Sequence, residues 1–225
     1  MNLSRFVATV VLAAVATSNH AADPVVVALG DSITRGERAG VKKDETFAAL
    51  LADRFKIEIA NAGIGGERTD GALARLDKDI LARKPKFVLV MYGTNDSFVD
   101  KGAKAPRLDV KTYRENLVSL VDRIRKSGAE PILLTEPRWA KDQKNGLGED
   151  PNPLLERYVD ACREVAKERG VPLVDHYRHW KEAEEKGTTL REWTTDGCHP
   201  NPRGHRELAD RIAPVLEKAL KPAKK

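Results

Sequence analysis

Short apolar runs alternate with helix-like stretches along most of the chain, and this alternation constrains the fold more than any other feature. Each run has the length of a β-strand, whereas each intervening stretch places apolar residues three or four positions apart. Strands that alternate with helices predict βαβ units and a mainly parallel sheet with helices on both faces. The runs are nearly all apolar, as expected of strands that are covered on both sides. The predicted strands are residues 25–29, 57–60, 87–91, 132–134 and 171–174.

Length and composition indicate one globular domain. The chain has 225 residues, of which 41% are hydrophobic and 32% are charged, so it can build a core without disulfide or metal staples. These proportions exclude a disordered chain. The net charge is +5, and charges of both signs are interleaved along the sequence. This pattern indicates solvated helix faces, and we expect no nucleic-acid partner.

The first 22 residues have the order of a secretory signal peptide. A start with one arginine precedes an apolar run at 6–16, and small residues follow it up to Ala22. The run is shorter than the roughly 20 residues that a membrane-spanning helix needs, so we expect no stable membrane insertion. A buried first helix is the alternative interpretation. We predict export to the periplasm or beyond, with residues 23–225 forming a single domain.

Glycine-rich and polar motifs follow three of the predicted strands, and a fourth motif precedes the last helix. Ligands of parallel sheets bind beyond the carboxyl ends of the strands. We therefore expect the winding of the sheet to bring all four motifs to one edge. The motifs are Gly-Asp-Ser at 30–32, a glycine-rich turn at 61–66, Gly-Thr-Asn-Asp at 93–96 and Asp-Gly-Cys-His-Pro at 196–200.

Together the motifs supply the groups that acyl transfer requires. A serine hydroxyl such as that of Ser32 needs a base to accept its proton, and His199 can serve as that base. Asp196 can orient the imidazole and stabilise its charged form. An oxyanion needs hydrogen-bond donors, which the backbone N–H groups of Ser32 and Gly66 and the side-chain amide of Asn95 could supply. At Gly66, the lack of a Cβ leaves room for an acyl group. This chemistry needs no cofactor and no metal.

The motifs resemble those of the SGNH hydrolases, also called GDSL-like esterases and lipases. The resemblance covers essentially the whole chain after the first 22 residues. It implies a three-layer α/β/α sandwich around a five-stranded parallel, flavodoxin-like sheet, and hydrolysis of carboxylic esters or thioesters. The chain lacks the Gly-x-Ser-x-Gly elbow of the α/β-hydrolases. The matching residues are Gly30, Asp31, Ser32 and Gly36; then Gly66; then Gly93, Thr94, Asn95 and Asp96; and finally Asp196, His199 and Pro200.

Each motif also has a plainer interpretation when it is taken alone. The first could be a turn into a helix, because Asp and Ser commonly cap helices, and Asn95-Asp96 could be a similar pair. The second could cradle a phosphate, although no Gly-Lys-Ser/Thr ending follows it. Within that motif, Gly63 or Gly65 could take the place of Gly66. Four motifs in order favour the hydrolase over a non-catalytic carbohydrate-binding relative or a phosphate-binding flavodoxin-like module.

Export, an aromatic share of only 5% and the absence of an obvious lipid-docking segment favour short acyl groups. We therefore expect a small-molecule or carbohydrate ester as substrate, with acetyl esters of carbohydrates preferred. A lysophospholipase or thioesterase that takes longer acyl chains is the alternative. The irregular segment 138–153 follows the fourth predicted strand, and we expect it to form a wall of the substrate site.

Several remaining residues have ordinary structural interpretations. A metal site at His176 and His179 lacks further ligands, so a solvated loop or helix end is favoured there. His205, early in the last helix, is expected at the surface. Trp180 and Trp193 could be core or rim residues.

The two cysteines leave two alternatives open. Export permits a disulfide between Cys162 and Cys198, whereas two buried thiols are equally compatible with the sequence. We do not expect Cys198 to be the nucleophile, because Ser32 already has its oxyanion partners.

Overall fold

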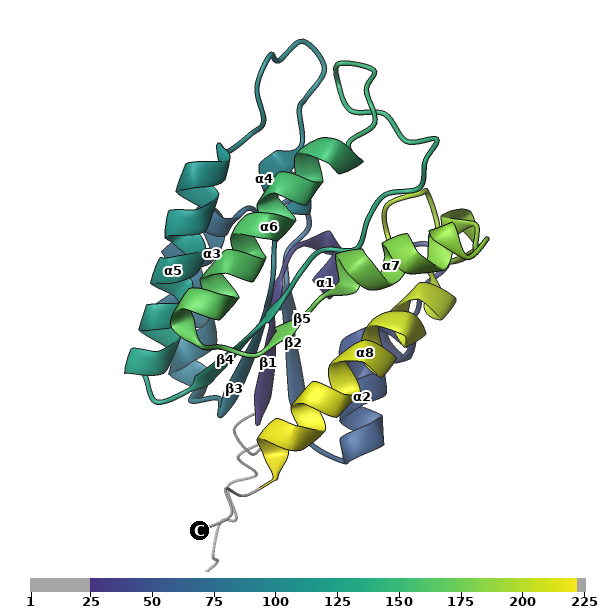
Figure 1. Ribbon diagram of the computed structural model, residues 1–225. Coiled ribbons are helices and arrows are strands. Elements are labelled where there is room, and N and C mark those ends of the chain that lie inside the picture. Colours follow the sequence, from purple (N-terminus) through teal and green to yellow (C-terminus); the bar gives the residue numbers. More distant parts are fainter. Residues whose placement is uncertain (1–24, 222–225) are drawn as a thin grey trace, which may run out of the picture.

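A five-stranded parallel sheet forms the middle layer of the protein, and helices cover both of its faces (Figure 1). The computed structural model describes residues 25–221, so the predicted signal segment at 1–22 lies outside the described residues. The strands lie in the order β2-β1-β3-β4-β5, which is the flavodoxin-like order. The predicted three-layer α/β/α sandwich is therefore confirmed. The strands are β1 (Val26–Gly30), β2 (Ile59–Gly63), β3 (Phe87–Met91), β4 (Glu130–Leu134) and β5 (Leu173–Val174).

The helices connect successive strands and pack on the sheet in two layers. The helices α2 and α8 lie on one side, whereas α3, α5 and α6 lie on the other (Figure 1). Short helical turns at Lys43–Glu45, Leu76–Ile80, Leu81–Arg83 and Leu190–Glu192 complete the described part. The helices are α1 (Ser32–Arg35), α2 (Phe47–Phe55), α3 (Thr69–Arg75), α4 (Thr94–Ser97), α5 (Val110–Lys126), α6 (Asn152–Arg169), α7 (His176–Glu185) and α8 (Pro202–Leu220).

Alternation of side chains along each strand builds a separate core on each face of the sheet. In β1, Val26 and Ala28 pack toward α2 and α8, whereas Val27 and Leu29 pack toward α3, α5 and α6. Successive side chains of a strand point to opposite faces, so an all-apolar strand fits a sheet that is covered on both sides. Trp180 and Trp193 belong to the first core, and this places both of them inside the protein.

Two histidines lie in the interior, and both expectations from the sequence are wrong in this respect. His205 is fully buried where α8 packs on α2, and its Nδ1 accepts a hydrogen bond from the backbone N–H of Phe47 at 3.3 Å. His176, the first residue of α7, is also fully buried, and burial lowers the pKa of its ring to about 3. Burial likewise lowers the pKa of His205 to about 4, so the neutral form of both rings is favoured at pH 7.

His179 contacts α8 rather than a metal site. Its ring nitrogens lie 3.0 Å from Glu207 Oε2 and 3.0 Å from an Arg211 guanidinium nitrogen. Within residues 25–221, no three His, Cys, Asp or Glu side chains gather in a way that could hold a metal ion. None of the helices in this part of the chain combines the length and apolar character needed to cross a membrane.

Gly36 allows the chain to turn against the buried ring of His205. Its φ is +70°, and a Cβ at this position would lie 2.8 Å from both that ring and the Thr46 methyl group. Gly40 has a similar φ of +84°, but a Cβ there would meet no atom within 4 Å. The two glycines therefore share an unfavourable backbone conformation and differ in the space around them.

We predict that Gly36→Ala destabilises the protein more than Gly40→Ala does. Positive φ costs a non-glycine residue roughly 1–2 kcal/mol, and forcing a methyl group into a packed site adds about 1–3 kcal/mol. Urea unfolding of the two variants measures the difference in the free energy of unfolding. Equal losses of stability would contradict the close packing of Gly36 against His205.

Candidate active site

Ser32 is the first residue of α1, and one residue separates it from the end of β1. The residue before it, Asp31, is fully buried and caps this short helix by accepting the backbone N–H of Ile33 at 2.8 Å. The other carboxylate oxygen of Asp31 accepts the side-chain amide of Asn95 at 2.7 Å. Burial raises the pKa of Asp31 to about 7. Through its hydrogen bond to Asn95, the carboxyl group of Asp31 connects the motif after β1 to the motif after β3.

The predicted nucleophile Ser32, the predicted base His199 and the carboxylate of Asp196 are joined by hydrogen bonds in that order. Ser32 Oγ is 3.0 Å from His199 Nε2, and His199 Nδ1 is 2.8 Å from Asp196 Oδ2. The other oxygen of Asp196 accepts the backbone N–H groups of Cys198 at 3.0 Å and His199 at 2.9 Å. Residues 167 positions apart in the sequence thus meet side by side, as the sequence predicts.

Burial favours a neutral His199, and hydrogen bonds favour an ionised Asp196. Burial would raise the pKa of Asp196, but hydrogen bonds from the loop N–H groups and from His199 outweigh it and lower the pKa to about 2. Burial lowers the pKa of His199, and the Asp196 carboxylate partly offsets this effect. An ionised Asp196 accepts a hydrogen bond from the Nδ1–H group of His199, so Nε2 is left unprotonated and can accept a proton from Ser32.

The side chain of Asn95 is held at both ends. Its amide nitrogen donates to Asp31, and its oxygen accepts from the Arg107 guanidinium at 3.0 Å. Arg107 is itself held by an ion pair with Asp100 at 2.7 Å. An amide nitrogen carries two N–H groups, so the second N–H of Asn95 is available to a ligand.

A cavity of about 160 Å³ lies beside Ser32. The rings of Phe98 and Trp139 stack with their centroids 5.6 Å apart and form its aromatic wall. Trp139 comes from the irregular segment 138–153, so this segment contributes a wall to the cavity, as expected. The lining residues are Ser32, Thr94, Asn95, Phe98, Arg107, Trp139, Cys198 and His199.

Gly66 lies in the turn between β2 and α3, and it does not line this cavity. Its φ is +76°, and a Cβ built there would meet no atom within 4 Å. The backbone conformation therefore favours glycine at this position. That a Cβ at Gly66 would crowd an acyl group remains a prediction.

Ionic and polar contacts fix the turn that carries Gly66. The carboxylate of Glu67 pairs with the Arg75 guanidinium and accepts the Tyr92 hydroxyl, each at 2.5 Å. Arg75 also donates to the Ala62 carbonyl at 2.7 Å, so this guanidinium connects both ends of the turn.

Asp96 supports the start of α3. Its Oδ1 accepts both the backbone N–H of Thr69 at 3.0 Å and the Thr69 hydroxyl at 2.7 Å. The fourth residue of the Gly-Thr-Asn-Asp motif thus holds the start of the helix that follows the glycine-rich turn.

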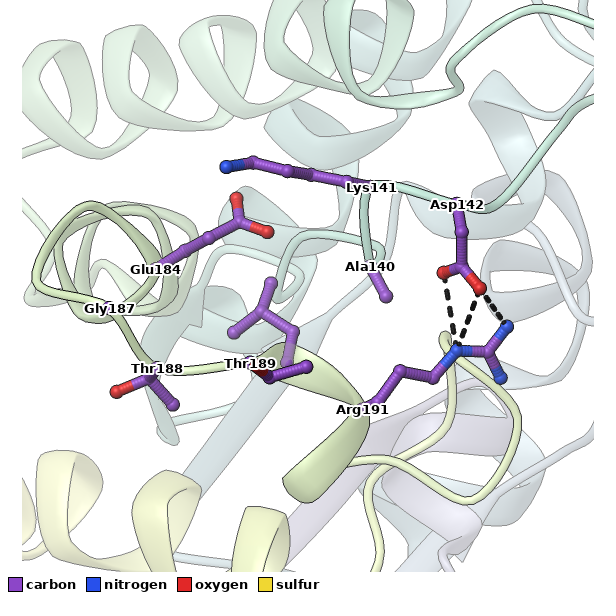
Figure 2. A pocket seen from close by; sticks show the side chains of 9 residues that line it. Ala140, Lys141, Asp142, Glu184, Gly187, Thr188, Thr189 and Arg191 are labelled. Carbon is purple, nitrogen blue, oxygen red and sulfur yellow. Dashed lines mark hydrogen bonds and ion pairs between the residues drawn. The ribbon is translucent and has the colours of Figure 1, made fainter.

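A larger cavity of about 490 Å³ lies between the 138–153 segment and the residues after α7 (Figure 2). Its lining is polar in part and includes the Asp142–Arg191 ion pair at 2.5 Å. None of the motif residues lines it. Because it lacks a nucleophile and base in contact, we place the chemistry in the smaller cavity beside Ser32.

Comparison with known proteins identifies the family. The family model described as the GDSL-like lipase/acylhydrolase family matches residues 28–207. The chain belongs to this family. Family membership makes it a hydrolase of the esterase and acylhydrolase type.

Relatives within the GDSL-like family carry different names. The uncharacterized lipoprotein YqeF of Bacillus subtilis is 35% identical, covering 83% of this chain and 87% of its own. Thioesterase 1/protease 1/lysophospholipase L1 of Escherichia coli is 28% identical, with coverages of 89% and 87%. An acetylxylan esterase of Geobacillus stearothermophilus is 27% identical, with coverages of 80% and 88%. The crystal structure of the lipase/acylhydrolase from Enterococcus faecalis superimposes with a TM-score of 0.70, is 28% identical, and covers 89% of this chain and 98% of its own.

Some residues of this GDSL-like site were not identified from the sequence. Arg107 and Phe98 lie outside the motifs, yet they contact Asn95 or line the cavity. Glu67 supports the Gly66 turn, and Arg38 donates to Asp196 Oδ2 at 2.9 Å. Charged residues are common along the chain, and nothing in their spacing distinguishes these from solvated ones.

The two cysteines are free thiols in separate cores, so the disulfide alternative is not realised. Cys162 on α6 packs on one face of the sheet, and Cys198 packs on the other. Burial raises the pKa of Cys162 to about 12 and that of Cys198 well above its ordinary value. Burial therefore disfavours the reactive thiolate form of both groups at neutral pH.

We predict two thiols per chain in a titration with Ellman's reagent under denaturing conditions without reductant. The native protein is expected to react with less than one equivalent, because burial keeps both groups protonated and shielded. A value of zero thiols after unfolding would contradict the separation of the two cysteines.

Proposed function

We propose that this protein is a serine esterase that forms an acyl-enzyme on Ser32. The observation that carries the proposal is the 3.0 Å approach of Ser32 Oγ to His199 Nε2, with Asp196 on the far side of the ring. A serine next to a neutral, oriented imidazole has the base that it needs to attack an ester carbonyl. A non-catalytic carbohydrate-binding relative would not need Ser32, His199 and Asp196 in this arrangement.

The proposed reaction proceeds in two halves. The Ser32 oxygen attacks the carbonyl carbon while its proton passes to Nε2 of His199. His199 then returns this proton to the departing alcohol, and an acyl group remains on Ser32. In the second half, His199 accepts a proton from water as the water attacks the acyl-enzyme, and the same proton returns to Ser32 Oγ when the carboxylic acid leaves. Each half passes through a tetrahedral oxyanion.

Three donors are proposed to stabilise that oxyanion: the backbone N–H groups of Ser32 and Gly66 and the amide of Asn95. The position of Asn95 supports this role most directly, because it lines the same cavity as Ser32 and its amide is held in one orientation by Asp31 and Arg107. A fixed donor spends no energy on reorientation when charge develops. The cycle uses only groups of the chain and no cofactor.

The small cavity favours short acyl groups. Its volume of about 160 Å³ is well below the roughly 300–1,000 Å³ of pockets that take drug-sized ligands. Acetyl esters of carbohydrates are the proposed substrates, which agrees with the acetylxylan esterase among the relatives. The longer-chain alternative agrees with the lysophospholipase name of another relative, but it needs a longer apolar groove beside Ser32.

Export is proposed from the first 22 residues, whose removal leaves 23–225 as a single hydrolase domain. The lipoprotein name of the Bacillus relative agrees with a location outside the cytoplasm. An exported enzyme would reach acetyl esters on carbohydrate polymers outside the cell.

We predict that Ser32→Ala lowers kcat/KM for p-nitrophenyl acetate by at least about 10³-fold, because the nucleophile is lost and only binding and oxyanion donors remain. Ser119→Ala on the distant helix α5 is the matched control and should retain wild-type activity. Retention of most activity by Ser32→Ala would contradict the mechanism.

We predict that Trp139→Ala shifts acyl preference toward longer chains, because it removes one ring of the aromatic wall. The ratio of kcat/KM for p-nitrophenyl hexanoate over acetate should rise by roughly tenfold. Leu147→Ala removes an exposed side chain (49% exposed) of the same segment and should leave the ratio unchanged. A wild-type optimum at eight carbons or more would contradict the short-chain assignment.

A further inference from the structure

A guanidinium group contacts the acidic member of the Ser32–His199–Asp196 row. Arg38 donates from Nη2 to Asp196 Oδ2 at 2.9 Å, and the same oxygen is 2.8 Å from His199 Nδ1. Arg38 lies in the turn after α1, outside the four motifs. The aspartate oxygen that orients the base is therefore shared between the base and a permanent cation.

We propose that Arg38 is a positioning residue that shares this oxygen with His199, disfavours the imidazolium by its positive charge, and so extends the range in which His199 serves as base to lower pH. This inference rests on the proposed function of the site. Arg38 does not line the small cavity, and its side chain donates to Asp196, so we infer that it acts through Asp196.

The turn that carries Arg38 is held in place. The backbone N–H of Arg38 donates to the Val41 carbonyl at 3.2 Å, and that of Val41 donates back to the Arg38 carbonyl at 2.9 Å. Val41 is buried, with 3% of its surface exposed. The Arg38 side chain is 29% exposed, so the guanidinium is partly shielded from water. A buried neighbour and a two-bond bridge thus direct Arg38 toward Asp196.

Asp196 has its acceptor capacity filled by this arrangement. One oxygen accepts two backbone N–H groups of its own loop, and the other accepts from the His199 ring and from Arg38. A carboxylate offers about four lone-pair sites, so the four donors fix both its rotation and its ionised state. A guanidinium is always charged at accessible pH, and its contribution is therefore constant.

The groups that face His199 act in opposite directions. Asp196, from its own loop, favours the imidazolium, whereas Arg38 and Arg35, from the turn after α1 and from α1 itself, disfavour it. Arg107, across the small cavity, carries a further positive charge. Of the three arginines, Arg38 is the one that shares an oxygen with the ring, so its removal changes the Asp196–His199 pair most.

The test compares Arg38→Gln, Arg38→Lys and wild type by two readouts. One is the acidic limb of kcat/KM against pH for p-nitrophenyl acetate, and the other is the NMR titration of the His199 ring. Without the cation, the imidazolium is more stable, so both midpoints should move to higher pH. The expected shift is from a few tenths of a pH unit to about one unit, because partly exposed ion pairs contribute about 0.2–1 kcal/mol or somewhat more when shielded.

The sign of the effect is specific to a positioning role. Activity below the midpoint should fall severalfold in Arg38→Gln, whereas the plateau at pH 8 should stay within about threefold of wild type, because His199 is neutral there in both proteins. Arg38→Lys keeps the positive charge but lacks the planar guanidinium, so its midpoint should lie between those of wild type and Arg38→Gln. Arg54→Gln removes an exposed arginine that pairs with Asp210 at 3.1 Å and should shift nothing.

Identical His199 titration midpoints in wild type and Arg38→Gln would overturn the inference. An equal loss of activity at every pH would also overturn it, because that result indicates a structural role alone. The NMR titration needs no turnover, so it decides the role of Arg38 even if the wild-type protein hydrolyses no ester. That last result would instead overturn the proposed function.

Discussion

The register of the parallel sheet determines where every functional group can lie. Gly30 at the end of β1 pairs with Gly63 of β2 on one side and with Met91 of β3 on the other. Because the three strands run parallel and end at the same level, the motifs that follow them emerge at one edge. A shift of one residue would turn the side chains of β1 to the opposite cores and move Ser32 away from Asn95.

Buried polar bonds then fix the motifs relative to one another. Asp31 joins the first motif to Asn95 of the third, and Asp96 joins the third to Thr69, just beyond the glycine-rich turn. Polar groups that lose water on burial are stable only with partners, so these bonds also select one arrangement of the loops. An antiparallel bridge between Thr194 and Pro200 closes the loop of the fourth motif. Within this loop, Asp196 and His199 are hydrogen-bonded to each other.

Much of this arrangement follows from local sequence, and the remainder depends on tertiary contacts. The run at 87–91 coincides with β3, because both cores cover it and its pattern is unambiguous. The predicted strand at 171–174 is longer than β5, which has only two residues. β5 lies at the edge of the sheet and pairs with β4 alone. The meeting of Ser32 with His199 was predictable because both lie in recognisable motifs. The burial of His205 was not, because it depends on how α8 packs against α2.

Covalent labelling tests whether Ser32 is a nucleophile that His199 activates. The purified protein is treated with a fluorophosphonate, digested and mapped by mass spectrometry. We expect one adduct per chain, on the peptide that contains Ser32, and loss of labelling in His199→Gln. Labelling of another residue, or none in a folded protein that hydrolyses p-nitrophenyl acetate, would contradict it.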